Sequence, residues 1–196
     1  MREAKSQIYF ATQNEGKFLE AARIAESFRI NLRHLNLEKE EIQASRLSDI
    51  ANFAALQAAR SANRGVVADD SGFFVKALHG FPGPYSSYVF DTIGLQGILK
   101  MMRGATNRGA YFQAAVAYCA PKRRPICFTG IVNGIVAQRP KGTHGFGYDP
   151  IFIPSEGDGR TFAQMKIDEK NLFSHRARAF TAFCKWMTRA SHRSGS

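Results

Sequence analysis

The sequence predicts a mixed α/β fold. Short apolar runs of strand character alternate with segments in which apolar residues recur at helical spacing. Two longer apolar runs, 110–120 and 126–137, flank a turn bracketed by prolines, which indicates an antiparallel hairpin. No internal repeat or linker-like stretch divides the 196 residues, so we expect one folding unit.

In the first half, strands and helices are expected to alternate. Residues 8–11 form a strand, and a polar turn follows it before a helix over 17–28. A second strand covers 32–37, and an alanine-rich helix covers 48–63. The apolar run 66–72 predicts a short strand that ends at its glycine.

In the second half, a helix over 94–102 precedes the hairpin. A glycine-rich loop, a short strand over 151–153 and a helix over 175–188 follow it. Residues 189–196 are expected to form a flexible tail, because the final segment, 191–196, lacks apolar side chains.

The composition is that of a globular protein, with 44% hydrophobic and 22% charged residues. No apolar stretch is long enough to span a bilayer and the polar start of the chain does not resemble a secretory signal, so we expect a cytoplasmic protein with no membrane partner. Cys119, Cys127 and Cys184 show no metal-binding or redox spacing and are expected to be reduced core residues.

The formal charge of +11 is unusual, and it fits either nucleic-acid binding or a pocket for a polyanionic small molecule. The tightest basic cluster, Lys122-Arg123-Arg124, lies between two prolines and is expected to be a solvated hairpin tip. Because the chain shows no nucleic-acid recognition motif and no basic stripe with interleaved aromatics, no stable nucleic-acid partner is expected.

The most informative local feature is the acidic pair Asp69-Asp70, which ends the apolar run from Val66. If the strand stops at Gly72, the pair lies where a strand gives way to a loop, which is where α/β proteins bind ligands. Because side chains alternate along a strand, one carboxylate is expected to face a cleft and the other to support it. A carboxylate so placed suits a divalent metal ion or a water nucleophile. The alternative is that the pair only caps a turn.

A polar corner, 11–17 (ATQNEGK), joins the first strand to the first helix. Backbone N–H groups and the positive end of the helix dipole favour an anion there, while Thr12 and Asn14 add side-chain donors and Lys17 adds a charge. The corner can therefore hold phosphate, although its spacing is not that of a Walker A loop. An N-capped helix with a solvated lysine is the other interpretation.

The acidic stretch 38–43 is expected to be mostly solvated. Mg2+ takes one or two carboxylates together with waters and substrate phosphates, so a glutamate of this stretch could complete a site begun by Asp70. The pattern alone does not say which glutamate.

The loop 144–150 (HGFGYDP) alternates glycines with aromatics, which lets backbone approach a ligand closely. A flat ring could stack on its aromatics, and Asp149 could accept hydrogen bonds from ring N–H groups. The alternative is a tight turn that carries two core aromatics.

The last helix begins after Ser174, which suits an N-cap. Arg176 lies one turn before Phe180 and should project along the buried face, where its guanidinium needs a carboxylate, a phosphate or a purine edge. A structural ion pair is the alternative. For His175, capping or packing is as well supported as catalysis.

Five motifs, in order along the chain, resemble those of one family, the Ham1-like or inosine triphosphate pyrophosphatase family. They are Thr12-x-Asn14-x-x-Lys17, Asp69-Asp70-Ser71-Gly72, Gly80-Phe81-Pro82-Gly83-Pro84-Tyr85-Ser86, Gly145-Phe146-Gly147-Tyr148-Asp149-Pro150-Ile151-Phe152, and Glu169-Lys170-Asn171 with Ser174-His175-Arg176. The resemblance covers nearly the whole chain, and the segments 80–89 and 142–144 look most like archaeal members.

The resemblance implies an elongated two-lobed α/β fold, in which a curved mixed β-sheet is flanked by helices and a cleft lies between the lobes. It implies a single domain over residues 1–188 and a homodimer. The implied activity is Mg2+-dependent hydrolysis of non-canonical purine nucleoside triphosphates (ITP, dITP and XTP) to the monophosphate and pyrophosphate, which removes them from the nucleotide pool.

The resemblance also implies residue roles. The phosphates would be held by Thr12, Gln13, Asn14, Glu15, Gly16 and Lys17. Mg2+ would be bound by Glu41 and Asp70, with Asp70 also the proton acceptor and Asp69 its support. Ser71 would touch the substrate, and the base with its flanking groups would be enclosed by Phe146, Gly147, Tyr148, Asp149, Lys170, His175 and Arg176.

Some positions depart from the family pattern. Gln13 stands where a smaller residue is common, Ser87 occupies a position that is basic in some relatives, and the alanine-rich helix lacks a lysine that many members have. Neutralising a triphosphate is therefore expected to depend on Lys17, Lys170, Arg176 and Mg2+. The alternatives are a pyrophosphatase with another base preference, such as pyrimidine triphosphates, and a nucleic-acid-binding module.

Overall fold

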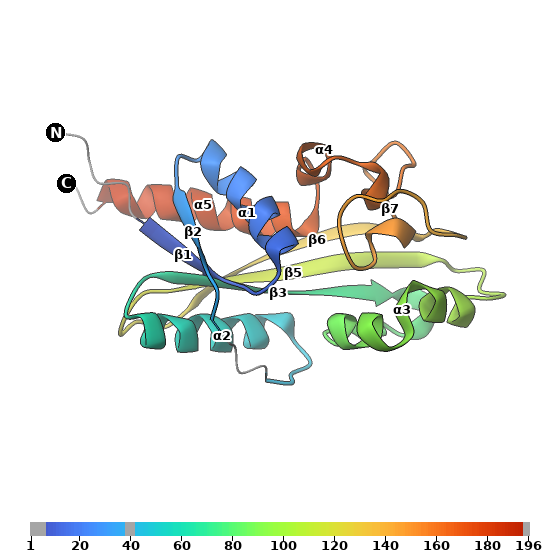
Figure 1. Cartoon of the computed structure of the whole chain (residues 1–196), viewed down its shortest axis with the longest axis horizontal. Helices are drawn as coiled ribbons and strands as arrows, with labels where there is room; N and C mark the ends of the chain where they lie inside the picture. The colour runs from blue at the N-terminus through green and yellow to red at the C-terminus, as the bar shows by residue number, and fades with distance from the viewer. Residues whose placement is uncertain (1–6, 38–41, 194–196) are drawn as a thin grey trace. The chain divides into compact units, whose positions relative to one another are not determined.

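A computed structural model of the chain describes residues 7–37 and 42–193. Helices and strands follow one another along it in a mixed order (Figure 1). The strands are β1 Gln7–Ala11, β2 Asn31–Leu35, β3 Val66–Val75, β4 Pro82–Gly83, β5 Gly109–Cys119, β6 Ile126–Val136 and β7 Phe152–Pro154. The α-helices are α1 Glu15–Ser27, α2 Leu47–Ala62, α3 Ser86–Met101, α4 Ile167–Asn171 and α5 His175–Arg193, and the 3-10 helices are η1 Lys76–Leu78, η2 Asp149–Ile151 and η3 Phe162–Gln164.

The strands form one mixed sheet in the order β2-β1-β3-β5-β6-β7, with β4 paired to β3. β1 is parallel to both β2 and β3, whereas β4 is antiparallel to β3 and β7 is antiparallel to β6. β5 and β6 are neighbours joined by a turn too short for a crossover, so they form the predicted antiparallel hairpin. Its tip carries Lys122, Arg123 and Arg124, all exposed as expected.

The chain divides into two compact units. The first contains the described residues within 1–70, 114–130 and 176–196, and the second contains 71–113 and 131–175. β3, β5 and β6 each begin in one unit and end in the other.

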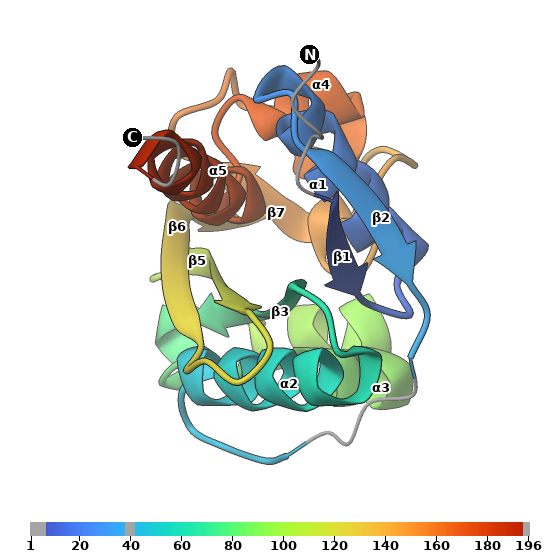
Figure 2. The same ribbon diagram turned by 90° about the vertical axis from the view of Figure 1, so that its left-hand side faces the viewer.

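In the first unit, α1 and α5 lie over one face of the strands and α2 lies over the opposite face (Figure 2). Alternate residues of β1, Ile8 and Phe10, join a core with Phe180 and Phe183 of α5 because every second strand side chain points to the same face. The rings of Phe10 and Phe180 meet edge to face, with 5.1 Å between their centroids.

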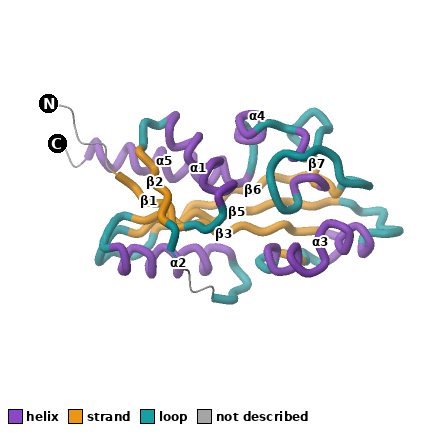
Figure 3. The backbone as a smooth tube through the Cα atoms, viewed as in Figure 1, coloured by secondary structure: helices purple, strands orange, loops and turns teal. Residues whose placement is uncertain are grey.

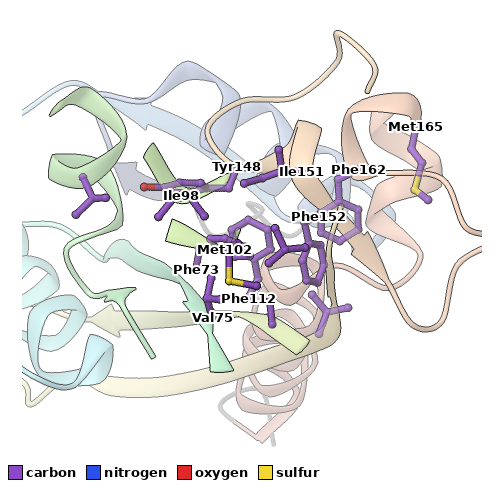
Figure 4. Packing of buried hydrophobic residues seen from close by; sticks show 14 residues of the cluster. Phe73, Val75, Ile98, Met102, Phe112, Tyr148, Ile151, Phe152, Phe162 and Met165 are labelled. Atoms are coloured by element: carbon purple, nitrogen blue, oxygen red, sulfur yellow. The ribbon is translucent and has the colours of Figure 1, made fainter. Parts of the chain in front are cut away.

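In the second unit, an aromatic core surrounds Phe73 of β3 (Figure 4). The ring centroids of Phe112 and Phe152 lie 4.9 Å and 6.0 Å from that of Phe73. Ile98 and Met102 at the end of α3 close this core. The connection 137–148 contains no helix or strand before η2, and it carries the glycine-rich loop (Figure 3).

Three element boundaries differ by more than two residues from the sequence-based expectation. β3 continues past Gly72 to Val75. α3 begins at Ser86 rather than near residue 94, because the non-helical backbone of Gly94 kinks it and only its second half has a clear helical pattern. α5 continues to Arg193, five residues beyond the predicted end, since arginine and alanine prolong a helix at little cost.

All three cysteines are free, with Cys119 and Cys184 buried and Cys127 half-buried. Within the described ranges, no helix is both long enough and apolar enough to cross a membrane.

Candidate active site

The polar corner in the first unit is built by its own side chains. Thr12 follows the last residue of β1 and is buried, and its Oγ1 accepts the Asn14 N–H at 3.1 Å. Asn14 is the N-cap of α1, and its Oδ1 accepts the Lys17 N–H at 3.0 Å. These two side chains were predicted as donors to a ligand. In the structure they accept backbone hydrogen bonds that shape the turn, which leaves the exposed Gln13 and Glu15 on its outer side.

Asp69 holds two cations at this corner. One carboxylate oxygen lies 3.2 Å from the Lys17 ammonium, and the other accepts the Arg176 Nε–H at 3.0 Å. A second guanidinium nitrogen of Arg176 donates to Glu20 of α1. The side chains of Asp69, Glu20 and Arg176 are each at most 4% exposed.

Charge balance explains how these groups can be buried together. Burial works against the guanidinium charge of Arg176, but Glu20 and Asp69 together outweigh it, so the pKa of Arg176 is raised above its ordinary value. Two carboxylates face two cations, and each buried charge has an opposite charge within hydrogen-bonding distance. Lys17 is thereby fixed in position at the first turn of α1.

The structure corrects the predicted surroundings of the acidic pair. Asp69 and Asp70 lie in the middle of β3 and not at its end. The parallel pairing of β3 with β1 nevertheless stops at Ala68, opposite Ala11, so Asp69 is the first residue beyond the end of β1. Asp69 is buried and Asp70 is half-buried, and their predicted placement on opposite faces of the strand stays a prediction.

The two carboxylates have different capacities for a metal ion. Both oxygens of Asp69 face cations, and its side chain is fully buried, whereas Asp70 is half-buried. The other predicted ligand, Glu41, lies outside the described residues. In the part of the chain that is described, no group of three or more His, Cys, Asp or Glu side chains could hold a metal by itself. Asp70 therefore fits Mg2+ only as one carboxylate among other donors, which is how Mg2+ commonly binds beside substrate phosphates.

The second unit contains a separate buried ion pair. The Lys170 ammonium lies 2.6 Å from Asp149 Oδ2, and both side chains are 3% exposed. Asp149 Oδ2 also accepts the Phe146 N–H at 3.0 Å. The ammonium lies 5.1 Å from the ring centre of Phe146 and 5.2 Å from that of Phe162, so it makes cation–π contacts with both. Of the residues predicted to enclose the base, this unit brings Phe146, Asp149 and Lys170 together.

Gly145 makes this arrangement possible. Its φ of +70° suits glycine, and a Cβ at this position would lie 2.1 Å from Asp149 Oδ2. The glycine therefore allows the loop backbone to pass directly over the Asp149 carboxylate.

Tyr148 is buried in the aromatic core of the second unit (Figure 4). Its hydroxyl donates to the Ser86 carbonyl at 3.0 Å, and its ring stacks on Phe73 with 4.9 Å between centroids. Burial, followed by the nearby Asp91, raises the pKa of the phenol, so it stays a donor. Tyr148 thus anchors the glycine-rich loop, and the half-buried Phe146 is the aromatic of that loop suited to stacking.

The remaining predicted residues occupy varied positions. His175, at the start of α5, is buried and stacks on Phe112 at 4.7 Å and 10°. Ser71 is half-buried beside Asp70, and Gly147 is half-buried with a φ of +60°. Arg176, predicted beside the base, lies in the Asp69 network of the first unit.

Sequence reasoning missed Glu20. It lies among Ala21, Ile24 and Ala25 on the buried face of α1, where a lone carboxylate needs a cationic partner. The position of Glu20 on the buried face of this helix was the available signal, because the inward arginine predicted at position 176 required a carboxylate or another anionic partner.

Comparisons with known proteins agree with the motif pattern. Residues 8–186 match the Ham1 family. The dITP/XTP pyrophosphatase of Methanopyrus kandleri is 48% identical over 179 residues, which cover 91% of this chain and 95% of that protein. The enzyme of the same name from Saccharolobus solfataricus is 49% identical over 176 residues, covering 90% and 91%. The structure of a HAM1 protein from Coxiella burnetii has a TM-score of 0.81 at 28% identity and covers 94% of this chain and 99% of its own.

Proposed function

Because this chain belongs to the Ham1 family, we propose that it is a dITP/XTP pyrophosphatase that hydrolyses non-canonical purine nucleoside triphosphates to the monophosphate and pyrophosphate. The observation that carries the proposal is near-complete coverage by two relatives of this name at almost half identity. The ion-paired corner in the first unit supports it, since Lys17 is held at a helix N-terminus suited to phosphate.

In the proposed mechanism, the corner orients the triphosphate. The Glu15 and Gly16 N–H groups in the first turn of α1 face outward from the helix and suit phosphate oxygens, and Lys17 adds a fixed positive charge. Asp70 accepts a proton from a water molecule, and the oxygen of that water attacks a phosphorus atom of the triphosphate. The bond between the monophosphate and the pyrophosphate breaks, and pyrophosphate leaves. Asp69 does not take that role, because its carboxylate is committed to Lys17 and Arg176.

Mg2+ is part of the proposal. Asp70 and Glu41 would hold it, and it would neutralise charge on the phosphates during bond cleavage. Asp70 and substrate phosphates supply the oxygen donors that this ion prefers.

The base would be bound by residues of the second unit. Phe146 supplies a face for stacking, and the Lys170–Asp149 pair supplies a fixed donor and acceptor. A donor opposite the six position donates to the keto oxygen of hypoxanthine or xanthine, while the amino group of adenine would leave that donor unpaired at a cost of about 1–3 kcal/mol. His175 and Ser71 are proposed to contact the substrate nearby.

A homodimer in the cytoplasm completes the proposal. In this proposal a second copy would cover exposed apolar side chains of the second unit, such as Tyr85 at 47% and Tyr88 at 71% exposure. A concentration series in analytical ultracentrifugation tests it, and a monomer at all concentrations would argue against it.

The activity is tested by incubating the protein with Mg2+ and a panel of triphosphates. Pyrophosphate release from dITP, ITP and XTP is expected, with much slower release from ATP. Orthophosphate as the product would contradict the reaction type, and faster turnover of pyrimidine triphosphates would favour the related enzyme class. Salt-dependent retention on DNA or RNA without any hydrolysis would favour a nucleic-acid-binding protein, for which the net charge of +11 is the supporting observation.

A further inference from the structure

His34 of β2 contacts both ends of the polar corner. Its Nε2 lies 2.7 Å from the Thr12 carbonyl oxygen, where β1 has just ended. Its ring stacks on Phe18, one residue beyond Lys17, with 4.6 Å between centroids and 16° between planes. β2 pairs with β1 in a register that sets His34 opposite Phe10, two residues before Thr12.

The chemistry of the shorter contact fixes the tautomer. A carbonyl oxygen can only accept a hydrogen bond, so His34 Nε2 carries the proton and donates it. The imidazole therefore holds the Thr12 carbonyl on its own side of the corner.

Holding that carbonyl also orients the next amide. In a trans peptide the C=O and the following N–H point in opposite directions, so the Gln13 N–H is directed away from His34. Within the described residues, the Gln13 N–H has no hydrogen-bond acceptor. Gln13 is exposed, and the Glu15 and Gly16 amides of the first helical turn follow it directly.

We propose that His34 is a positioning residue for phosphate binding: by fixing the Thr12 carbonyl it directs the Gln13 N–H toward the bound phosphate, alongside the first amides of α1. This inference rests on the proposed function, because it assigns that phosphate to the corner. Stacking on Phe18 keeps the imidazole in place between the strand end and the helix.

Two variants separate the donor from the ring. His34→Gln keeps an N–H donor on a side chain of similar reach, and His34→Phe keeps a flat ring on Phe18 without a donor. The probe is inorganic pyrophosphate, titrated into 15N-labelled protein while the amide signals of Gln13, Glu15 and Gly16 are followed. The tautomer is read separately from the 15N shifts of the His34 ring.

The expected result is an Nε2–H imidazole and a shift of the Gln13 amide on pyrophosphate binding. His34→Phe should weaken pyrophosphate binding about 5–10-fold, which corresponds to one lost hydrogen bond of ordinary strength. The KM for XTP should rise by the same factor with kcat unchanged, because the interaction is made in both ground and transition states. His34→Gln should stay within about twofold of the unchanged protein on both measures.

Several outcomes would overturn the proposal. They are an Nδ1–H tautomer, a Gln13 amide that does not respond to pyrophosphate, equal binding by His34→Phe and the unchanged protein, or an equal loss in both variants. If triphosphates are not hydrolysed but the amide response and the split between variants are seen, the inference stands and the proposed function fails. If hydrolysis is seen without the split, the function stands and the inference fails.

Discussion

Removing the Glu20 carboxylate should destabilise the protein strongly. Glu20 is one of two carboxylates that neutralise the buried guanidinium of Arg176. The Glu20 side chain is 4% exposed and the Arg176 side chain is 1% exposed, so water hardly reaches either. Breaking a buried pair by removing one partner leaves an uncompensated charge and costs about 3–5 kcal/mol. For a chain of this size each kcal/mol lowers Tm by about 2–4 °C, so Glu20→Ala is expected to lower Tm by about 6–20 °C.

The same helix offers a matched control. Glu26 lies 3.9 Å from Arg23, and these side chains are 77% and 59% exposed. Glu26→Ala should cost less than about 0.5 kcal/mol, because exposed pairs are weak. Urea unfolding of both variants at low salt and at 1 M salt is the assay, since a buried pair is screened far less than an exposed one.

A cycle of substitutions tests whether the cost comes from the unpaired charge. Glu20→Gln and Arg176→Met each leave a partner uncompensated, so the double variant should lose less than the sum of the two single losses. If Glu20→Ala costs no more than Glu26→Ala, or if the single losses simply add, the charge-balance argument is wrong.

Three further predictions concern the site and the thiols. Asp70→Asn should abolish pyrophosphate release while leaving Tm within a few degrees, and retained turnover would exclude it as the proton acceptor. Gly145→Ala should raise the KM for XTP and lower Tm, because its Cβ would lie 2.1 Å from Asp149 Oδ2; a normal KM would show that this contact does not shape the base site. Cys184 is fully buried and burial raises its pKa to about 12, so at pH 8 a thiol reagent should modify it in urea but not in the folded protein; modification of Cys184 in the folded protein at pH 8 would contradict this.

The order of elements was predictable because each leaves a periodic pattern. The alternation of apolar and polar residues and the position of turn residues predicted β1 and β2, the strands before the first two helices. The same signals predicted the hairpin of β5 and β6. The half of α3 before Gly94 was missed, since the kink interrupts its period. Its boundary could not be read from spacing alone.

The end of β3 was predicted wrongly for a physical reason. Gly72 was interpreted as a strand breaker, but the structure shows a tertiary cause for this glycine. A Cβ at position 72 would lie 2.4 Å from the Gly83 carbonyl oxygen of β4, so only glycine allows the two strands to approach. A contact between residues this far apart leaves no local pattern.

The site was predictable where a side chain had one sensible direction. Arg176 was expected on the buried face and is there, but the choice between a carboxylate and a ligand as its partner needed the three-dimensional position of Glu20. The position of Tyr148 in the core could not be predicted either, because its ring stacks on Phe73, which is distant in sequence. Phe146, Asp149 and Lys170 lie together as the motifs suggested, and their contact with a base stays a prediction.

Because the acidic pair lies inside a regular strand, its two members differ in whether they occupy an odd or an even position of that strand. Odd and even positions of β3 face opposite sides, and the two aspartates share the same chemistry but sit one step apart. Deleting or inserting one residue between Val66 and Asp69 would exchange their sides without changing a single functional group. The number of residues from Val66 to the pair therefore decides which aspartate faces which side, whereas changes in the length of the loops before and after β3 leave that assignment unchanged.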